Sequence, residues 1–129
     1  MPFGDRLAVQ HFDHLVLTCR DVERTLEWYV DRLGLEAIHV EEWRRGERPF
    51  PSVRISPVTI IDLIPGEPSG DRLNHICLVV ERCDLVAVAA ERGLEVWEGP
   101  VPRYGAQGEG TSIYVLDPDG LTVELRHYG

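Results

Sequence analysis

The chain has 129 residues, the size of a single domain that can bury a core without disulfides. Its formal net charge of −9 argues against a nucleic-acid partner, because phosphate binding needs clustered basic residues. The three cysteines form no disulfide pattern, the N-terminus has no apolar signal segment, and no apolar run is long enough to span a membrane. We therefore expect a cytoplasmic protein with no membrane partner.

Hydrophobic periodicity and turn signals predict the order β-α-β-β-β twice. In the first half we expect strands at 12–19, 35–43, 53–56 and 58–64, with a helix between Asp21 and Gly34 and a loop at 44–52. In the second half we expect strands at 73–80, 94–98, 111–116 and 121–127, a helix at 84–92, and a long loop at 99–110 that could act as a lid. The motif Asp117-Pro118-Asp119-Gly120 predicts a hairpin before the last strand.

A linker-like segment at 65–70 separates the two halves. We therefore expect a single domain, 1–129, made of module 1 at about 10–66 and module 2 at about 72–129. The fold class is α+β.

Histidine and acid recur at matching places in the two halves. Asp13-His14 and Asn74-His75 each open the first strand of a half, and Asp62 and Glu124 lie in the last strands. In these strands one face is aliphatic and suits packing on a helix, whereas the candidate ligands share the other face. A curved sheet would then gather all four polar side chains in one cleft. Two imidazoles with one or two carboxylates suit one divalent metal per site, namely Mn, Fe, Ni, Co or Zn, with open coordination positions.

These motifs together resemble the vicinal oxygen chelate superfamily, which includes glyoxalase I, extradiol dioxygenases, and fosfomycin- and bleomycin-resistance proteins. The resemblance runs from Phe12 to Gly129. It rests on the following motifs: Asp13-His14, Trp28-Tyr29 before Leu33-Gly34-Leu35, Asn74-His75-Ile76, and Asp117-Pro118-Asp119-Gly120 before Glu124-Leu125. Glyoxalase-like and fosfomycin-resistance-like members are the most similar.

The resemblance implies a fold of two βαβββ modules that form a half-open barrel. It implies metal ligation by His14, His75 and Glu124, and it places Asp62 where glyoxalase I has a Glu that ligates the metal and transfers protons. Because Asp is one methylene shorter, Asp62 could ligate, act as a base through water, or only hold a hydrogen bond. The resemblance also implies a homodimer with sites at the module interface, in which His14 comes from one chain and His75 and Glu124 from the other.

We expect an enzyme of the glyoxalase-like class that acts on a small substrate chelating the metal through neighbouring oxygens, by isomerase- or lyase-type proton transfer. Catalytic roles fall to Asp62 and Glu124, and Tyr114, Arg126 and Val16 are candidate substrate contacts. The runner-up is fosfomycin-type epoxide opening, although Val16 replaces the Thr of the thiol-transferring enzymes of that kind. Extradiol cleavage has less support, because its additional His and Tyr residues find no match.

A metal-free module that sequesters a ligand, of the bleomycin-resistance kind, is the alternative from another class. Cys77 shares the predicted face of His75, so a nucleophilic role is conceivable, but a small buried hydrophobe is the simpler interpretation.

Overall fold

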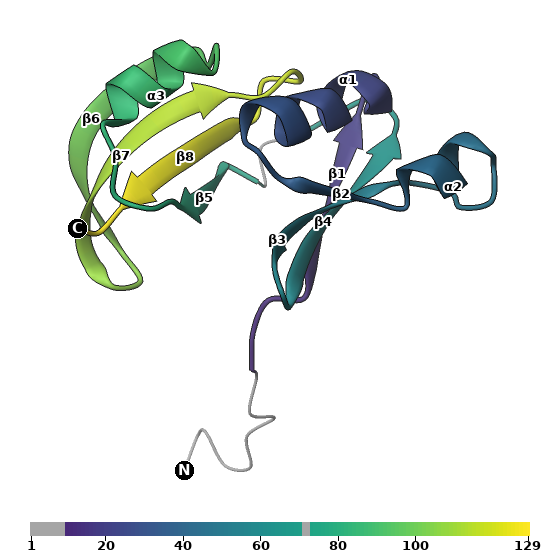
Figure 1. The fold of residues 1–129 in the computed structure, drawn as a ribbon, viewed down its shortest axis with the longest axis horizontal. Helices are drawn as coiled ribbons and strands as arrows, with labels where there is room; N and C mark the ends of the chain where they lie inside the picture. Colours follow the sequence, from purple (N-terminus) through teal and green to yellow (C-terminus); the bar gives the residue numbers. More distant parts are fainter. Residues whose placement is uncertain (1–9, 71–72) are drawn as a thin grey trace.

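Two mixed four-stranded sheets occupy separate halves of the molecule in the computed structural model, which describes residues 10–70 and 73–129 (Figure 1). The first half contains β1 (His14–Cys19), α1 (Val22–Glu27), η1 (Trp28–Arg32), β2 (Glu36–Ile38), α2 (Val40–Arg44), β3 (Ser52–Ser56) and β4 (Thr59–Pro65). The second half contains β5 (His75–Val79), α3 (Leu85–Glu91), β6 (Val96–Gly105), β7 (Gly108–Leu116) and β8 (Thr122–His127). The predicted β-α-β-β-β order therefore occurs twice, and the α+β fold is confirmed.

The internal repeat extends to the strand register. The sheet orders are β1-β4-β3-β2 and β5-β8-β7-β6, and in each sheet the first strand runs parallel to the last. Val16 pairs with Asp62 in the first sheet, and Cys77 pairs with Glu124 in the second. Since Val16 and Cys77 each follow a histidine by two residues, the two His–acid pairs occupy equivalent places in the two sheets.

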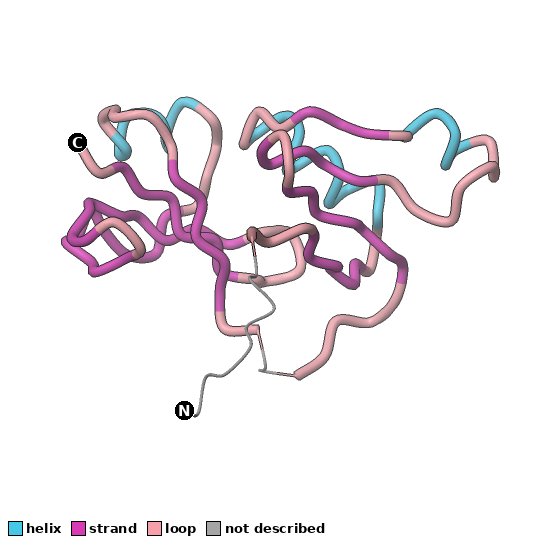
Figure 2. Tube along the Cα trace, turned by 90° about the horizontal axis from the view of Figure 1, so that it is seen from below, coloured by secondary structure: helices cyan, strands magenta, loops and turns pink. Residues whose placement is uncertain are grey.

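Each sheet has one covered face and one open face. Helices α1 and α3 lie on the same side of the two sheets, and the view in Figure 2 also separates the two strand groups. The covered faces carry the predicted aliphatic residues, including Leu17, Leu63, Val123 and Leu125, which are buried. The open faces carry the candidate ligands, so the predicted division of the strands into two faces is confirmed.

The turn between β7 and β8 joins the two modules. Within this turn the Asp117 carboxylate accepts hydrogen bonds from the backbone N–H groups of Asp119 and Leu121, both at 2.9 Å. Its other oxygen accepts from the buried Tyr29 hydroxyl of module 1 at 3.0 Å. Thr25 of α1 donates to Asp119 at 3.2 Å. The predicted hairpin is therefore present, and it also fixes how the modules sit in one chain.

The helix of module 1 begins and ends as predicted but changes its winding. Asp21 caps it by accepting from the backbone N–H of Arg24 at 3.1 Å, and Gly34 ends it with a φ of 77°. Between these ends the helix passes into the π-helical turn η1. Among the described residues, no helix is long and apolar enough to cross a bilayer.

Two predicted boundaries are wrong. The strand expected at 35–43 ends at Ile38, because His39 takes a left-handed conformation, with its ring 2.6 Å from Glu42, and starts α2. The loop expected at 99–110 is instead the hairpin of β6 and β7, with pairing that continues to Gly105 and Gly108. Strand pairing leaves only a short turn there, which removes the basis for a long lid.

Candidate functional site

The second sheet brings His75 and Glu124 into direct contact. His75 opens β5 and Glu124 lies in the middle of the adjacent β8. The imidazole Nε2 lies 3.1 Å from Oε1 of the carboxylate. The other carboxylate oxygen, Oε2, accepts hydrogen bonds from Ser112 Oγ at 2.6 Å and from Arg126 Nη2 at 2.8 Å. Oε2 is therefore fully engaged, and only Oε1 faces the histidine.

Arg126 is buried together with Glu124, since each side chain is only 4% exposed. Its guanidinium also donates to the backbone oxygen of Tyr104 at 3.1 Å and to the Tyr128 hydroxyl at 3.2 Å. Burial alone would raise the pKa of Glu124, but hydrogen bonds from Ser112 and Arg126 hold that pKa below its ordinary value. Glu124 is therefore ionised at neutral pH.

The preceding residue orients the His75 ring. Nδ1 lies 2.7 Å from the side-chain oxygen of Asn74, and this contact sets the direction of the ring. With Nδ1 engaged by Asn74, Nε2 is the ring atom that faces Glu124 Oε1, at 3.1 Å.

In the first sheet His14 and Asp62 are each held by a neighbour in the same way, but among the described residues no hydrogen bond or ion pair joins them to each other. His14 Nδ1 lies 2.8 Å from Asp13 Oδ2, and Asp62 Oδ1 accepts from Ser52 Oγ at 2.6 Å. The hydrogen bond to Asp13 is the main cause of a raised pKa at His14, and the nearby Asp62 charge acts in the same direction. Each histidine is thus held through Nδ1 by the residue before it, which directs Nε2 of His75 at Glu124 and leaves Nε2 of His14 to other partners.

Sequence reasoning missed the two serines that hold the acids. Ser52 in β3 and Ser112 in β7 both donate to a carboxylate across the sheet at 2.6 Å. A serine in the strand next to the acid-bearing strand of each half was the available signal. Its meaning depends on strand pairing, which only the structure shows.

The four predicted ligands do not meet in one chain. Over residues 10–70 and 73–129, no group of three or more His, Cys, Asp and Glu side chains lies close enough to hold a metal ion. The structure brings His75 and Glu124 together, and it places His14 near Asp62 in the other sheet. The donor types and the freed Nε2 atoms fit a divalent cation, but one chain provides only two half-sites.

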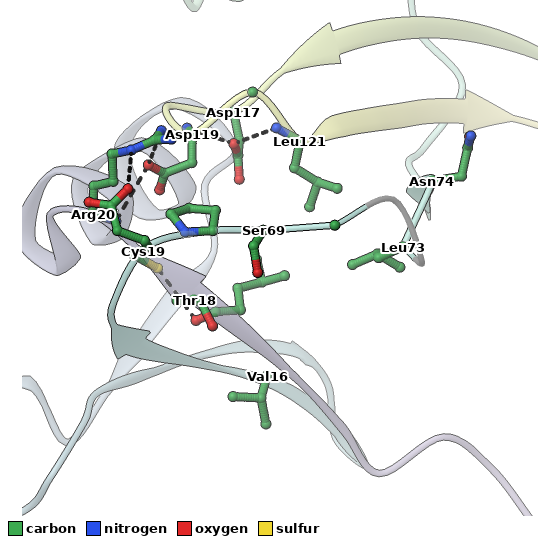
Figure 3. Close-up of a pocket in the computed structure, with 15 residues that line it drawn as sticks. Val16, Thr18, Cys19, Arg20, Ser69, Leu73, Asn74, Asp117, Asp119 and Leu121 are labelled. Carbon is green, nitrogen blue, oxygen red and sulfur yellow. Dashed lines mark hydrogen bonds and ion pairs between the residues drawn. The ribbon is translucent and has the colours of Figure 1, made fainter.

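A hollow of about 750 Å³ lies between the two modules, lined by the end of β1, the 67–70 segment and the turn before β8; none of the four candidate ligands lines it (Figure 3). Val16, the strand partner of Asp62, contributes to one wall, and Asn74, the hydrogen-bond partner of His75, contributes to another. An ion pair between Arg20 and Asp119 lies at one end. A small polar molecule in this hollow would contact residues of both modules.

The remaining candidate residues lie on the open faces. The Tyr114 ring meets the His75 ring edge-on, with centroids 6.1 Å apart. Val16 is 46% exposed. Cys77 is exposed rather than buried as predicted, because β5 is the edge strand of its sheet. Partial desolvation raises the pKa of the Cys77 thiol, so it is protonated at neutral pH and a weak nucleophile.

Comparison with known proteins agrees with this architecture. A glyoxalase domain-containing protein, RDO1, of Mycosarcoma maydis is 36% identical over 95% of this chain and 71% of its own length. A probable lactoylglutathione lyase of Synechocystis is 27% identical over 87% of this chain and 91% of its own length. The crystal structure of virulence protein STM3117 from Salmonella typhimurium superposes with a TM-score of 0.73 at 29% identity, covering 95% of this chain and all of that one.

The family model of the Glyoxalase/Bleomycin resistance protein/Dioxygenase superfamily matches residues 11–125, which include both half-sites. The chain therefore belongs to this superfamily.

Proposed function

We propose that the protein is a divalent-metal-dependent enzyme of the glyoxalase-like class. Its substrate would be a small molecule that chelates the ion through neighbouring oxygens, and the reaction would be a proton transfer of the isomerase or lyase type. The observation that carries this proposal is the fixed orientation of both imidazoles. In each half-site Nδ1 is engaged by the preceding residue, so that Nε2 is the atom left to bind a cation.

We propose further that each site forms between two copies of the chain. One chain brings together no more than a His–acid pair among its described residues, whereas a metal that activates substrate needs three or four protein ligands. The open sheet faces carry both pairs, so a second copy could place His14 and Asp62 of one chain opposite His75 and Glu124 of the other. A homodimer would then contain two such sites.

The roles of the side chains follow from their contacts. When bound, the divalent ion supplies Lewis-acid stabilisation of negative charge on a substrate oxygen. Glu124 offers Oε1 alone, because Ser112 and Arg126 occupy Oε2. Ser52 holds Oδ1 of Asp62, and within residues 10–70 and 73–129 no side chain hydrogen-bonds to Oδ2, which suits a group that accepts a proton and returns it.

Metal analysis of protein purified without chelator tests the metal requirement. We expect stoichiometric Mn, Fe, Co, Ni or Zn in the wild type, and loss of the metal in His14→Ala and Glu124→Ala. Activity would be assayed first with lactoylglutathione, the compound in the name of the Synechocystis relative. A wild-type protein that binds none of these ions under any loading condition would contradict the proposal.

A mixed dimer tests whether the sites are shared. A His14→Ala chain paired with a Glu124→Ala chain would carry both defects in one site and leave the other intact, so one metal ion per dimer is expected. Sites built within single chains would each carry one defect, and the mixed dimer would then bind no metal. This second result would refute the shared site without touching the metal requirement.

A metal-free binding protein is the second candidate function. The observation in its favour is that Arg126 already supplies a positive charge to Glu124, so the second half-site is electrostatically satisfied without an ion. Ligand binding that persists at full strength in a metal-free wild-type protein would favour this candidate.

A further inference from the structure

Three aromatic rings form a continuous surface on the open face of the second sheet. The rings of Trp97 in β6 and Tyr114 in β7 lie 5.3 Å apart between centroids and are tilted by 43°. Tyr114 in turn meets His75 edge-on at 6.1 Å. Trp97 is 53% exposed, although burying an indole is among the most favourable contributions to a core. This aromatic surface (Trp97, Tyr114 and His75) therefore leads from solvent to the His75–Glu124 pair.

Irregular strand pairing places Trp97 there. Val96 pairs with Val115 and Glu98 pairs with Tyr114, so two steps along β6 match one step along β7 and Trp97 is the additional residue. Such a bulge redirects side chains and is common beside functional sites. The result is that both Trp97 and Glu98 lie beside Tyr114, which regular alternation would not allow.

Arg103 borders the aromatic surface. The Arg103 guanidinium carbon lies 5.8 Å from the centroid of the Tyr114 ring, and Arg103 Nη2 lies 2.7 Å from Glu98 Oε1. Both partners of this ion pair are about 40% exposed (41% and 39%), so water screens the attraction and exchange for another carboxylate is inexpensive. A guanidinium can bind an incoming carboxylate through two parallel hydrogen bonds.

We propose that the aromatic surface and Arg103 bind a planar aromatic carboxylate. The ring system would rest on Trp97 and Tyr114, and the carboxylate would replace Glu98 at Arg103. A flat ring gains face and edge contacts with these side chains that a saturated ring of equal size does not. One part of this proposal rests on the proposed function, namely that the far edge of the ligand presents oxygens to a metal at His75. Binding of the ring system to the aromatic surface does not depend on a metal.

Calorimetric titration of the metal-free full chain tests this proposal with two probes, a naphthalene carboxylate and the fully saturated decalin carboxylate. We expect the naphthalene compound to bind roughly threefold to tenfold more tightly, the range given by aromatic pairing. The Trp97→Leu variant should lose this preference. Tyr104→Leu is the matched control, because Tyr104 is an aromatic residue of the same strand that is 88% exposed and outside the aromatic surface.

Two further measurements locate the ligand. In a proton–nitrogen correlation spectrum, only the indole N–H signal of Trp97 should shift, while those of Trp28 and Trp43 stay in place. Glu98→Gln should tighten binding of the naphthalene compound by freeing Arg103, and Arg103→Gln should weaken it. Because the titration uses metal-free protein, a failed metal site does not alter its result, so the two failures are told apart.

Equal affinities for the two probes, or an unchanged preference in Trp97→Leu, would overturn the proposal. The proposal would also be overturned if Trp97 were protected from solvent in the ligand-free dimer and neither probe shifted its indole N–H signal. The second copy of the chain would then cover this face.

Discussion

Replacing Arg126 with methionine should destabilise the protein and should do so through Glu124. The two side chains are equally buried and joined at 2.8 Å, so methionine leaves an ionised carboxylate without its cation in a poorly solvated place. Breaking a buried ion pair from one side costs about 3–5 kcal/mol of folding free energy. We expect about 3 kcal/mol, the lower end, because Glu124 keeps Ser112 and His75 as partners.

Equilibrium denaturation at neutral pH, in the presence of a chelator, measures this cost. The decisive comparison is the double variant Arg126→Met with Glu124→Gln, in which neither charge remains. Its loss of stability should be smaller than the sum of the two single losses by about 1–3 kcal/mol, since the pair is in direct contact. Arg103→Met is the matched control, because its pair with Glu98 is solvent-exposed and should leave the unfolding midpoint unchanged.

If the double variant lost as much free energy of unfolding as the two single variants together, the two buried charges would be energetically independent and the prediction would be refuted. An Arg126→Met variant as stable as Arg103→Met would likewise show that the guanidinium does not hold Glu124. Either result would remove the reason for assigning a single available oxygen to Glu124.

Two further substitutions test the packing that positions the half-sites. Tyr29→Phe should cost about 1.5–3 kcal/mol, the range for a buried hydrogen bond to a charged group, as measured by denaturation. Burial raises the pKa of Asp117, and loss of the hydrogen bond from Tyr29 would raise that pKa further. The stability cost of Tyr29→Phe should therefore shrink as pH falls through the folded-state pKa of Asp117. A stability cost that does not depend on pH would contradict this. Gly99→Ala should lower the free energy of unfolding by about 3 kcal/mol or more, because a Cβ there would lie 2.9 Å from Ile113 Cα. Gly46→Ala, where a Cβ would meet open space, should lower it by about 1–2 kcal/mol. Equal thermal midpoints for the two variants would refute this difference.

The repeated motifs made most of the fold predictable. Period-two alternation placed His14 and Asp62 on one face and the aliphatic residues on the other, and the structure has this division. The Asp117–Gly120 turn was predictable because its residues are locally specific. Its contact with Tyr29 was not, because that contact joins residues of different modules.

The two boundary errors have local physical causes. His39 adopts a positive φ that no sequence pattern indicates, and a new helix starts there. Glycines at 99, 105 and 108 read as a loop, yet β6 needs Gly99 because Ile113 approaches its backbone at the register shift between Glu98 and Val101. The preceding shift, between Val96 and Glu98, redirects Trp97, which explains why sequence reasoning found Tyr114 but not its aromatic neighbour.

The difference between Asp62 and Glu124 leads to the last prediction. Glu124 has Arg126 as a buried cationic partner, whereas among the described residues no arginine forms an ion pair with Asp62. The guanidinium and Ser112 fix the orientation of the Glu124 carboxylate, which suits a ligand, whereas Asp62 is held through one oxygen by a serine hydroxyl and presents the other to a substrate proton. Under the proposed function, ligation would therefore fall to Glu124 and proton transfer to Asp62.

Asp62→Asn should therefore keep the metal and lose the reaction. The amide oxygen can still accept from Ser52, so the fold should persist and metal affinity should fall by less than about tenfold. Glu124→Gln should lower metal affinity by more than about 100-fold, beyond the effect of losing an outer partner. The rate of the metal-dependent reaction should fall by about 100- to 10,000-fold in Asp62→Asn, the contribution of a general base. If metal affinity fell equally in both variants, Asp62 would be a ligand, and the proton would have to move through another group.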